Sequence, residues 1–218
     1  MLGSFADYLV GYTTNCVARL VRSSNVAFVR TRIPSIAVVS INSLLVFAGT
    51  SYVILMSQIV IPLHFTPVMV SLGTFSIFTM SAVLGCKRAV CSSALYVVLG
   101  FSGVPVFQGY KTGTQVTMGY LVGYILASYI IGKLAENGKD RKLLSSFGTM
   151  LISTPMLYIP GVAWLMYSMN ITSVEKGLEL GFYPFLIGDL LKILAAGLLM
   201  PGLWKIFKWT SRTKNGGE

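Results

Sequence analysis

Charged side chains are scarce in this sequence. They account for 11% of the 218 residues, whereas a soluble domain usually carries about 25%. Apolar residues account for 54%, and a chain of that composition would expose large apolar patches to water. The composition therefore excludes an ordinary soluble domain and indicates a protein whose surface is solvated by lipid.

Residues that build metal sites, disulfide frameworks and catalytic centres are also few. The three cysteines, Cys16, Cys86 and Cys91, fit neither a disulfide framework nor a zinc site. His64 is the only histidine, so it lacks a histidine partner for binding a metal. The glycines within residues 100–103 lack the Lys-Ser/Thr ending of a phosphate-binding loop. We therefore expect no metal, no cofactor, no ATPase and no enzymatic activity in this chain.

Long uncharged apolar runs occupy most of the chain, and a bilayer span needs about 20 apolar residues. The runs predict six transmembrane helices, near residues 35–61, 68–84, 89–101, 118–135, 143–169 and 184–207. We therefore predict an all-α, multi-pass membrane protein. It would comprise a cytoplasmic N-terminal extension over residues 1–32, a six-helix transmembrane substrate-binding domain over 33–208 and a basic cytoplasmic tail over 209–218.

The basic residues are distributed unevenly between the two ends of these helices. With the N-terminus inside, the inside segments contain fourteen of them: Arg19, Arg22, Arg30, Arg32, Lys87, Arg88, Lys133, Lys139, Arg141, Lys142, Lys205, Lys208, Arg212 and Lys214. The outside loops contain Lys111 and Lys176, and Lys192 lies within a span. The positive-inside rule then places both termini in the cytoplasm. The net charge of +10 thus indicates orientation in the cell (inner) membrane rather than binding to nucleic acid.

Small residues recur every four positions in the fourth predicted helix, at Gly119, Gly123 and Ala127, and again at Ser128 and Gly132. This spacing favours close packing between membrane helices. The partner helix could belong to this chain or to another subunit.

The sixth predicted helix contains two opposite charges, Asp189 and Lys192. At a spacing of three they share one helix face. A charge within a bilayer costs roughly 2.5–3.5 kcal/mol on insertion scales, so such residues usually pair and face a cavity. The alternative is a pair at the membrane interface that only anchors the helix. We take Asp189 and Lys192 as candidate substrate-binding residues.

The outer loop before the fourth helix is the second candidate region. It combines aromatic and polar side chains, including Phe107, Gln108, Lys111 and, at its end, Tyr120. Small-molecule sites usually have this mixed composition. The alternative is an ordinary solvated loop.

Three stretches, in this order along the chain, resemble the BioY family, the biotin-binding membrane subunits of energy-coupling-factor transporters. The first is Ile-Pro-Leu at 61–63 with Thr-Pro-Val-Met-Val at 66–70 and Thr-Phe at 74–75. The second is Gly-Val-Pro-Val-Phe at 103–107, continuing to Gly-Tyr-Leu-Val-Gly-Tyr at 119–124. The third is Tyr-Pro-Phe-Leu-Ile-Gly-Asp-Leu-Leu-Lys at 183–192. The chain departs from the family at residues 115–120, where a Gly-Pro-Thr-Gly-Gly-Tyr segment is usual, and at Gly73, where a glutamine is usual.

The resemblance implies a six-helix fold that is surrounded by membrane lipid and binds biotin from the outer side of the membrane. It also implies partners, namely a transmembrane coupling subunit and two ATPase subunits. The acid tail of biotin would then point toward the outer loop, where Lys111 is the only cation. Two other readings stay open: the same fold serving another vitamin, and an intramembrane enzyme or structural membrane protein.

Overall fold

The computed structural model describes residues 35–140 and 142–215. The predicted N-terminal extension and Arg141 therefore lie outside the described residues. The chain divides into two compact units. One is residues 46–201; the other includes, among the described residues, 35–45 and 202–215, which are helical.

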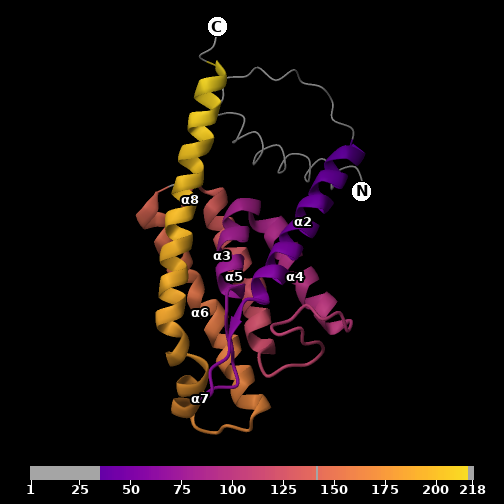
Figure 1. The fold of residues 1–218 in the computed structure, drawn as a ribbon, viewed down its shortest axis with the longest axis vertical. Helices are drawn as coiled ribbons and strands as arrows, with labels where there is room; N and C mark the ends of the chain where they lie inside the picture. The colour runs from indigo at the N-terminus through magenta and orange to yellow at the C-terminus, as the bar shows by residue number, and fades with distance from the viewer. Residues whose placement is uncertain (1–34, 141, 216–218) are drawn as a thin grey trace. The chain divides into compact units, whose positions relative to one another are not determined.

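The described chain is mostly helical, as predicted. Its helices are α2 (Ser35–Ser57), α3 (Gly73–Leu84), α4 (Cys86–Phe101), α5 (Met118–Glu136), α6 (Leu143–Ser168), α7 (Val174–Gly181), the short 3-10 helix η1 (Tyr183–Phe185) and α8 (Leu186–Asn215). Two short strands, β1 (Val60–Ile61) and β2 (Val70–Ser71), pair antiparallel. Helix α5 packs against α3, α4 and α6, and α7 packs against α6. Figure 1 shows the strands, the loop after α4 and α7 at the same end of this unit.

Two expectations about the chain's path were wrong. Residues 68–72 do not begin the second helix, because β2 pairs with β1 before α3 starts at Gly73. The polar segment over residues 170–183 is not simply a loop, since it contains α7. Ser173 caps that helix by accepting from the backbone N–H of Lys176, and Glu175 lies in its first turn. Both features are favourable at a helix N-terminus.

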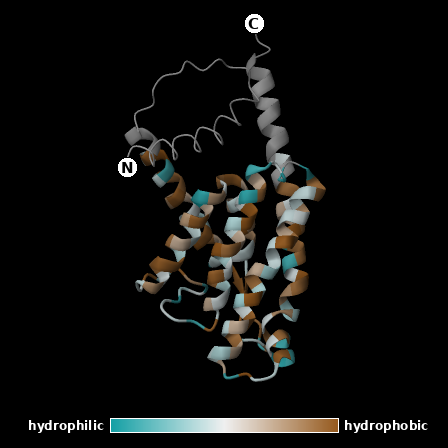
Figure 2. Cartoon of the chain, turned by 180° about the vertical axis from the view of Figure 1, so that it is seen from behind, coloured by the Kyte–Doolittle hydropathy of each residue, from teal (hydrophilic) through white to brown (hydrophobic). Residues whose placement is uncertain are grey.

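Four helical segments in the described chain are long and apolar enough to cross a membrane: Val39–Ser57, Met118–Glu136, Leu143–Ser168 and Val174–Leu199, the last of which joins α7, η1 and α8. Helix α3, with 12 residues, is apolar but shorter, and α4 has 16 residues. Figure 2 shows hydrophobic residues along the helices, with many of the hydrophilic ones near helix ends. The fold is that of a multi-pass membrane protein.

The small residues of α5 pack within this chain. A Cβ on Gly123 would lie 2.7 Å from the Cα of Leu157 on α6. A Cβ on Gly132 would lie 2.5 Å from the Cα of Cys86, at the start of α4. Only glycine allows backbones to approach so closely. The prediction of close helix packing is therefore confirmed, and the partner helices are α4 and α6.

Helices α3 and α4 are joined by a single residue, Gly85, which has a left-handed backbone with φ of +77°. The N–H of Cys86 donates to Oε1 of Glu136 at 2.9 Å. This carboxylate satisfies one of the open N–H groups at the start of α4. The tight turn makes α3 and α4 neighbours, and the hydrogen bond fixes the start of α4 to the end of α5.

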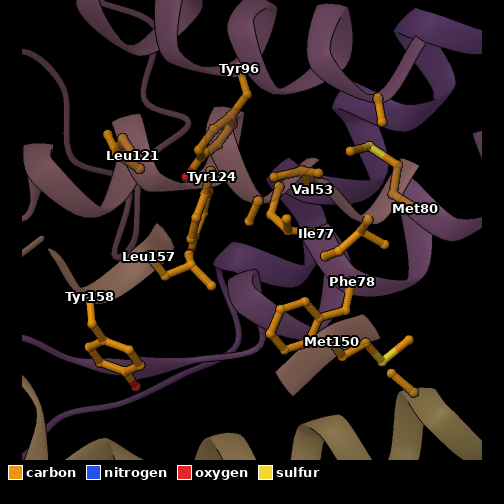
Figure 3. Close-up of a cluster of buried hydrophobic side chains, with 14 of the residues drawn as sticks. Val53, Ile77, Phe78, Met80, Tyr96, Leu121, Tyr124, Met150, Leu157 and Tyr158 are labelled. Carbon is orange, nitrogen blue, oxygen red and sulfur yellow. The ribbon is translucent and has the colours of Figure 1, made fainter. Parts of the chain in front are cut away.

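The core of this unit is a single cluster that includes Val53, Phe78 and Met150, each at most 1% exposed. The rings of Tyr96 and Tyr124 extend it and stack with centroids 6.4 Å apart. Figure 3 shows these side chains converging from different helices. In lipid this contact is favoured by close packing rather than by release from water.

Candidate functional site

Asp189 and Lys192 lie in the first turns of α8, and their spacing brings them together as predicted. The Nζ of Lys192 donates to Oδ1 of Asp189 at 2.7 Å. Asp189 is 4% exposed. A buried ion pair is retained only where hydrogen bonds satisfy both partners, so the neighbours of this pair define the site.

Two further hydroxyls, those of Thr74 and Tyr158, complete the surroundings of the pair. Thr74 belongs to the first BioY-like stretch of the sequence, but neither residue was predicted to line the site. Tyr158 on α6 donates from its hydroxyl to Oδ2 of Asp189 at 2.6 Å. Lys192 donates to Oγ1 of Thr74 at 2.9 Å, and that hydroxyl lies 3.3 Å from Oδ1 of Asp189, to which it donates. We call Asp189, Lys192, Thr74 and Tyr158 the charged cluster. Its members come from α3, α6 and α8, so helix packing assembles it.

A cavity opens beside the charged cluster. It comprises about 590 Å³ of space free of protein atoms, a figure that includes open solvent at its mouth. The lining combines the charged cluster with aromatic, aliphatic and small polar side chains: Val68, Met69, Ser71, Thr74, Tyr96, Phe107, Gln108, Thr117, Tyr120, Leu121, Tyr124, Leu157, Tyr158, Phe185, Asp189 and Lys192. The cavity therefore offers one ionic wall within a mostly apolar chamber.

Phe107 and Gln108, two of the candidate residues from the outer loop, line the cavity. Phe107 is buried at 3% exposure and packs edge-on against Tyr96, with ring centroids 5.5 Å apart. Gln108 donates from Nε2 to Oγ of Ser71 on β2 at 2.7 Å. The loop thus supplies part of the cavity wall through these two side chains.

Tyr120 connects the cavity to α7. Its hydroxyl donates to the carbonyl oxygen of Gly181 at 2.6 Å. Its ring meets that of Tyr158 edge-on, with centroids 6.1 Å apart. Tyr120 thereby supports the tyrosine that donates to Asp189.

Lys111 is the one candidate that does not line this cavity. It is exposed and lines a smaller neighbouring opening with Pro67, Gln115 and Val116. The two openings share Met69, Phe107, Gln108 and Thr117. Lys111 therefore lies beside the main cavity, separated from it by the side chains common to both.

Neutral hydroxyls lie at and next to another part of the wall: Ser71, Tyr96 and Tyr124 line the cavity, and Ser57 does not. Ser57 and Tyr96 are both fully buried. The hydroxyls of Ser57, Ser71 and Tyr124 converge on Gly73, where a Cβ would lie 3.2, 3.1 and 2.5 Å from them. A longer side chain at Gly73 would therefore displace these groups.

His64 is exposed and lies outside both openings. Across residues 35–140 and 142–215, no group of three or more His, Cys, Asp or Glu side chains could hold a metal ion. The cavity lining itself offers hydrogen-bonding groups, one ion pair and apolar contact.

Helices of membrane-spanning length around a mostly apolar cavity with a buried ion pair define a class: multi-pass membrane proteins that bind a small polar molecule. Comparisons with known proteins identify the family. The sequence profile described as the BioY family matches residues 30–209. The chain belongs to the BioY family, which confirms the resemblance.

Individual relatives agree. A biotin transporter BioY from Thermotoga maritima is 35% identical over 161 residues, covering 72% of this chain and 92% of that protein. A probable biotin transporter BioY from Methanothermobacter thermautotrophicus is 34% identical over 128 residues, covering 54% and 82%. These relatives are named as transporters and not as enzymes.

The fold is also similar to a crystal structure of the S-component for biotin from an ECF-type ABC transporter. The TM-score is 0.68 at 21% identity, and the match covers 76% of this chain and 92% of that one. This similarity extends to the fold and assigns no individual side chain.

Proposed function

We propose that this chain binds biotin at the outer side of the cell (inner) membrane and serves as the substrate-specific subunit of an energy-coupling-factor transporter. Membership of the BioY family supports this proposal. The observation that carries it is the charged cluster on the wall of a largely apolar cavity. Charge-assisted hydrogen bonds are strong in such surroundings.

The chemistry of biotin matches this wall. Its ureido group has two N–H donors and one oxygen acceptor, and its ring system is otherwise apolar. Asp189 would accept from a ureido N–H, and Lys192 would donate to the ureido oxygen. Leu121, Leu157 and Phe107 line the same cavity and would contact the apolar ring. Before the ligand arrives, the pair and its two hydroxyl partners satisfy one another.

The acid tail of biotin needs a second polar contact away from Asp189. We assign it to Lys111, because the opening that Lys111 lines shares four side chains with the main cavity. An ammonium on a flexible stem suits a carboxylate at an exposed position. Gln108 lies on the shared wall and would contact the ligand between these two ends.

We further propose six membrane spans with both termini in the cytoplasm. At about 1.5 Å per residue, the 12 residues of α3 and 16 of α4 rise about 18 and 24 Å, less than the roughly 30 Å hydrocarbon core. The β1–β2 hairpin and the loop after α4 would continue them toward the outer surface. The charge distribution along the sequence supports this orientation.

Transport would need energy from other subunits, because the sequence contains no phosphate-binding loop. The proposed partners are a transmembrane coupling subunit and two ATPase subunits, with membrane lipid around the helices. Nucleic acid is not a proposed partner.

Binding of radiolabelled biotin to the purified full-length chain in detergent tests the function directly. We expect saturable binding that unlabelled biotin displaces and that thiamine or riboflavin in excess does not. The Asp189→Ala/Lys192→Ala double variant is the control for a lost site. Absence of saturable binding would contradict the proposal, and displacement by another vitamin would favour the same fold with a different substrate.

A further inference from the structure

The loop that supplies Phe107 and Gln108 to the cavity has a sequence that favours flexibility. Gly103, Gly109 and Gly113 all have a left-handed backbone, with φ of +92°, +70° and +67°. Tyr110 has φ of +59°, which is uncommon for a residue other than glycine. Such a conformation persists only where the surrounding contacts determine it. Some contact must therefore fix this loop at the cavity.

Gln58, just beyond the end of α2, makes that contact. Its Nε2 donates to the carbonyl oxygen of Val106 at 2.9 Å and to that of Phe107 at 3.2 Å. Its Oε1 accepts from the backbone N–H of Tyr110 at 3.1 Å. Two carbonyl oxygens face the Nε2 of Gln58 and one backbone N–H faces its Oε1. This pattern fixes which end of the amide group points to which partner.

These three hydrogen bonds hold both sides of one turn. Phe107 N–H donates to the carbonyl of Lys111 at 3.2 Å, which closes the turn internally. Gln108 lies between the points where Gln58 binds the backbone, and its own side chain donates to Ser71. The position of Gln58 thus determines where Gln108 projects.

The side chain of Phe107 also seats the turn on α4. A Cβ on Gly100 would lie 2.1 Å from Cζ of Phe107, so the ring fills the space left by the missing side chain. Gln58 itself lines neither opening. It therefore reaches the ligand only through the loop that it holds.

We propose that Gln58 is a positioning residue for substrate binding, which holds the turn over residues 106–110 so that Gln108 and Phe107 form the cavity wall before the ligand arrives. A wall that is formed in advance spares the ligand the entropy of ordering the loop. This inference rests on the proposed function for its ligand, although the ordering of the loop is independent of it.

The test uses Gln58→Met, which keeps the length of the side chain and removes all three hydrogen bonds. Biotin affinity should fall about tenfold, which corresponds to about 1.4 kcal/mol. In a Gln108→Ala background the same change should cost less than about threefold, because residues that act through one network are not additive. An equal loss in both backgrounds, or no loss in either, would overturn the proposal.

Ser102→Ala is the matched control. It removes a side-chain hydrogen bond to a backbone carbonyl, that of Val98, at the start of the same loop, yet it holds no distant segment. Its affinity should equal that of the wild type. If Gln58→Met does not fold, Gln58→Glu replaces it, since the carboxylate keeps the acceptor for Tyr110 and loses the amide donors.

Hydrogen–deuterium exchange without ligand separates this proposal from the proposed function. In the Gln58 variants the amides of residues 104–112 should exchange faster, while those of α5 and α6 should be unchanged. Should the wild type bind no biotin, the function would fail, yet faster exchange confined to the loop would still support the positioning role. Unchanged exchange in the loop would overturn it in either case.

Discussion

Asp189 is a carboxylate surrounded by three hydrogen-bond donors from three helices. Lys192 supplies the charge, and the hydroxyls of Thr74 and Tyr158 supply the rest. Because the carboxylate is buried, its negative charge is stabilised by these donors instead of by water. Removing one member of the group leaves a buried charge or polar group without its partner. Asp189 therefore depends on the packing of α3 and α6 against α8 for the position in which it would bind the ligand.

Removal of either charge should weaken biotin binding. Losing one partner of a buried, hydrogen-bonded charge pair costs about 2–5 kcal/mol, and about 1.4 kcal/mol is a factor of ten. Asp189→Ala and Lys192→Ala should each lower affinity at least tenfold in titrations of folded protein. The double variant should lose less than the sum, because the residues share one network. Unchanged affinity in both single variants, with a lower folding yield, would instead assign the pair to helix anchoring.

Lys111→Ala separates the contact with the acid tail from other effects. If the ammonium binds the carboxylate, this change should weaken biotin and leave an uncharged amide analogue of biotin nearly unaffected. The measurement compares the two ligands on wild type and variant. Lys176→Ala, on α7 and in neither opening, is a matched control for a lost outer cation. Equal effects on both ligands, or none on either, would remove Lys111 from the site.

Among the secondary-structure elements, α5 and α6 set the shape of the cavity. Gly119 and Gly123 bring α5 against the backbone of α6, and the same pair of helices supplies Tyr120, Tyr124 and Tyr158 to the lining. A change in their spacing would therefore move several contacts at once.

Gly123→Ala should lower thermal stability in detergent. Its Cβ would lie 2.7 Å from the Cα of Leu157 and 2.8 Å from the carbonyl oxygen of Met156, and backbone atoms cannot shift without moving the helix. Overpacking of this kind costs about 1–3 kcal/mol. Gly148→Ala on α6 is the control, since nothing lies within 4 Å of its Cβ position and alanine favours a helix. Equal melting temperatures for the two variants would contradict close packing at Gly123.

For the molecule as a whole, the orientation in the membrane decides which face receives the ligand. Lys111 and Lys176 belong to the segments that hold the cavity loop and α7, and these segments lie together at one end of their unit (Figure 1). The proposed topology assigns that end to the outside.

Labelling of single cysteines introduced at residues 111 and 176 of a cysteine-free variant tests this topology. A membrane-impermeant reagent added to intact cells should label both positions. A cysteine in place of Lys87, in the first turn of α4, should be labelled only after the cells are opened. Protection of residue 111 or 176 in intact cells would refute the six-span arrangement.

The sequence by itself determined the membrane-embedded character, the approximate positions of the helices and the pairing of Asp189 with Lys192. These follow from composition and from short-range periodicity, which act within one helix. The glycine spacing of α5 likewise indicated close packing, although the sequence left the partner helix open. The family resemblance also followed from local motifs.

Only the tertiary structure decided which residues surround the pair. Thr74 and Tyr158 lie 115 and 31 residues from Asp189, and no spacing rule connects them. Val70 and Ser71 pair with Ile61 and Val60 instead of beginning the second helix, so their backbone groups are satisfied across a hairpin. The hydrogen bonds of Gln58 to a turn about 50 residues away are likewise contacts that no sequence spacing predicts. Contacts across such separations depend on how helices pack, and that packing is a property of the folded chain.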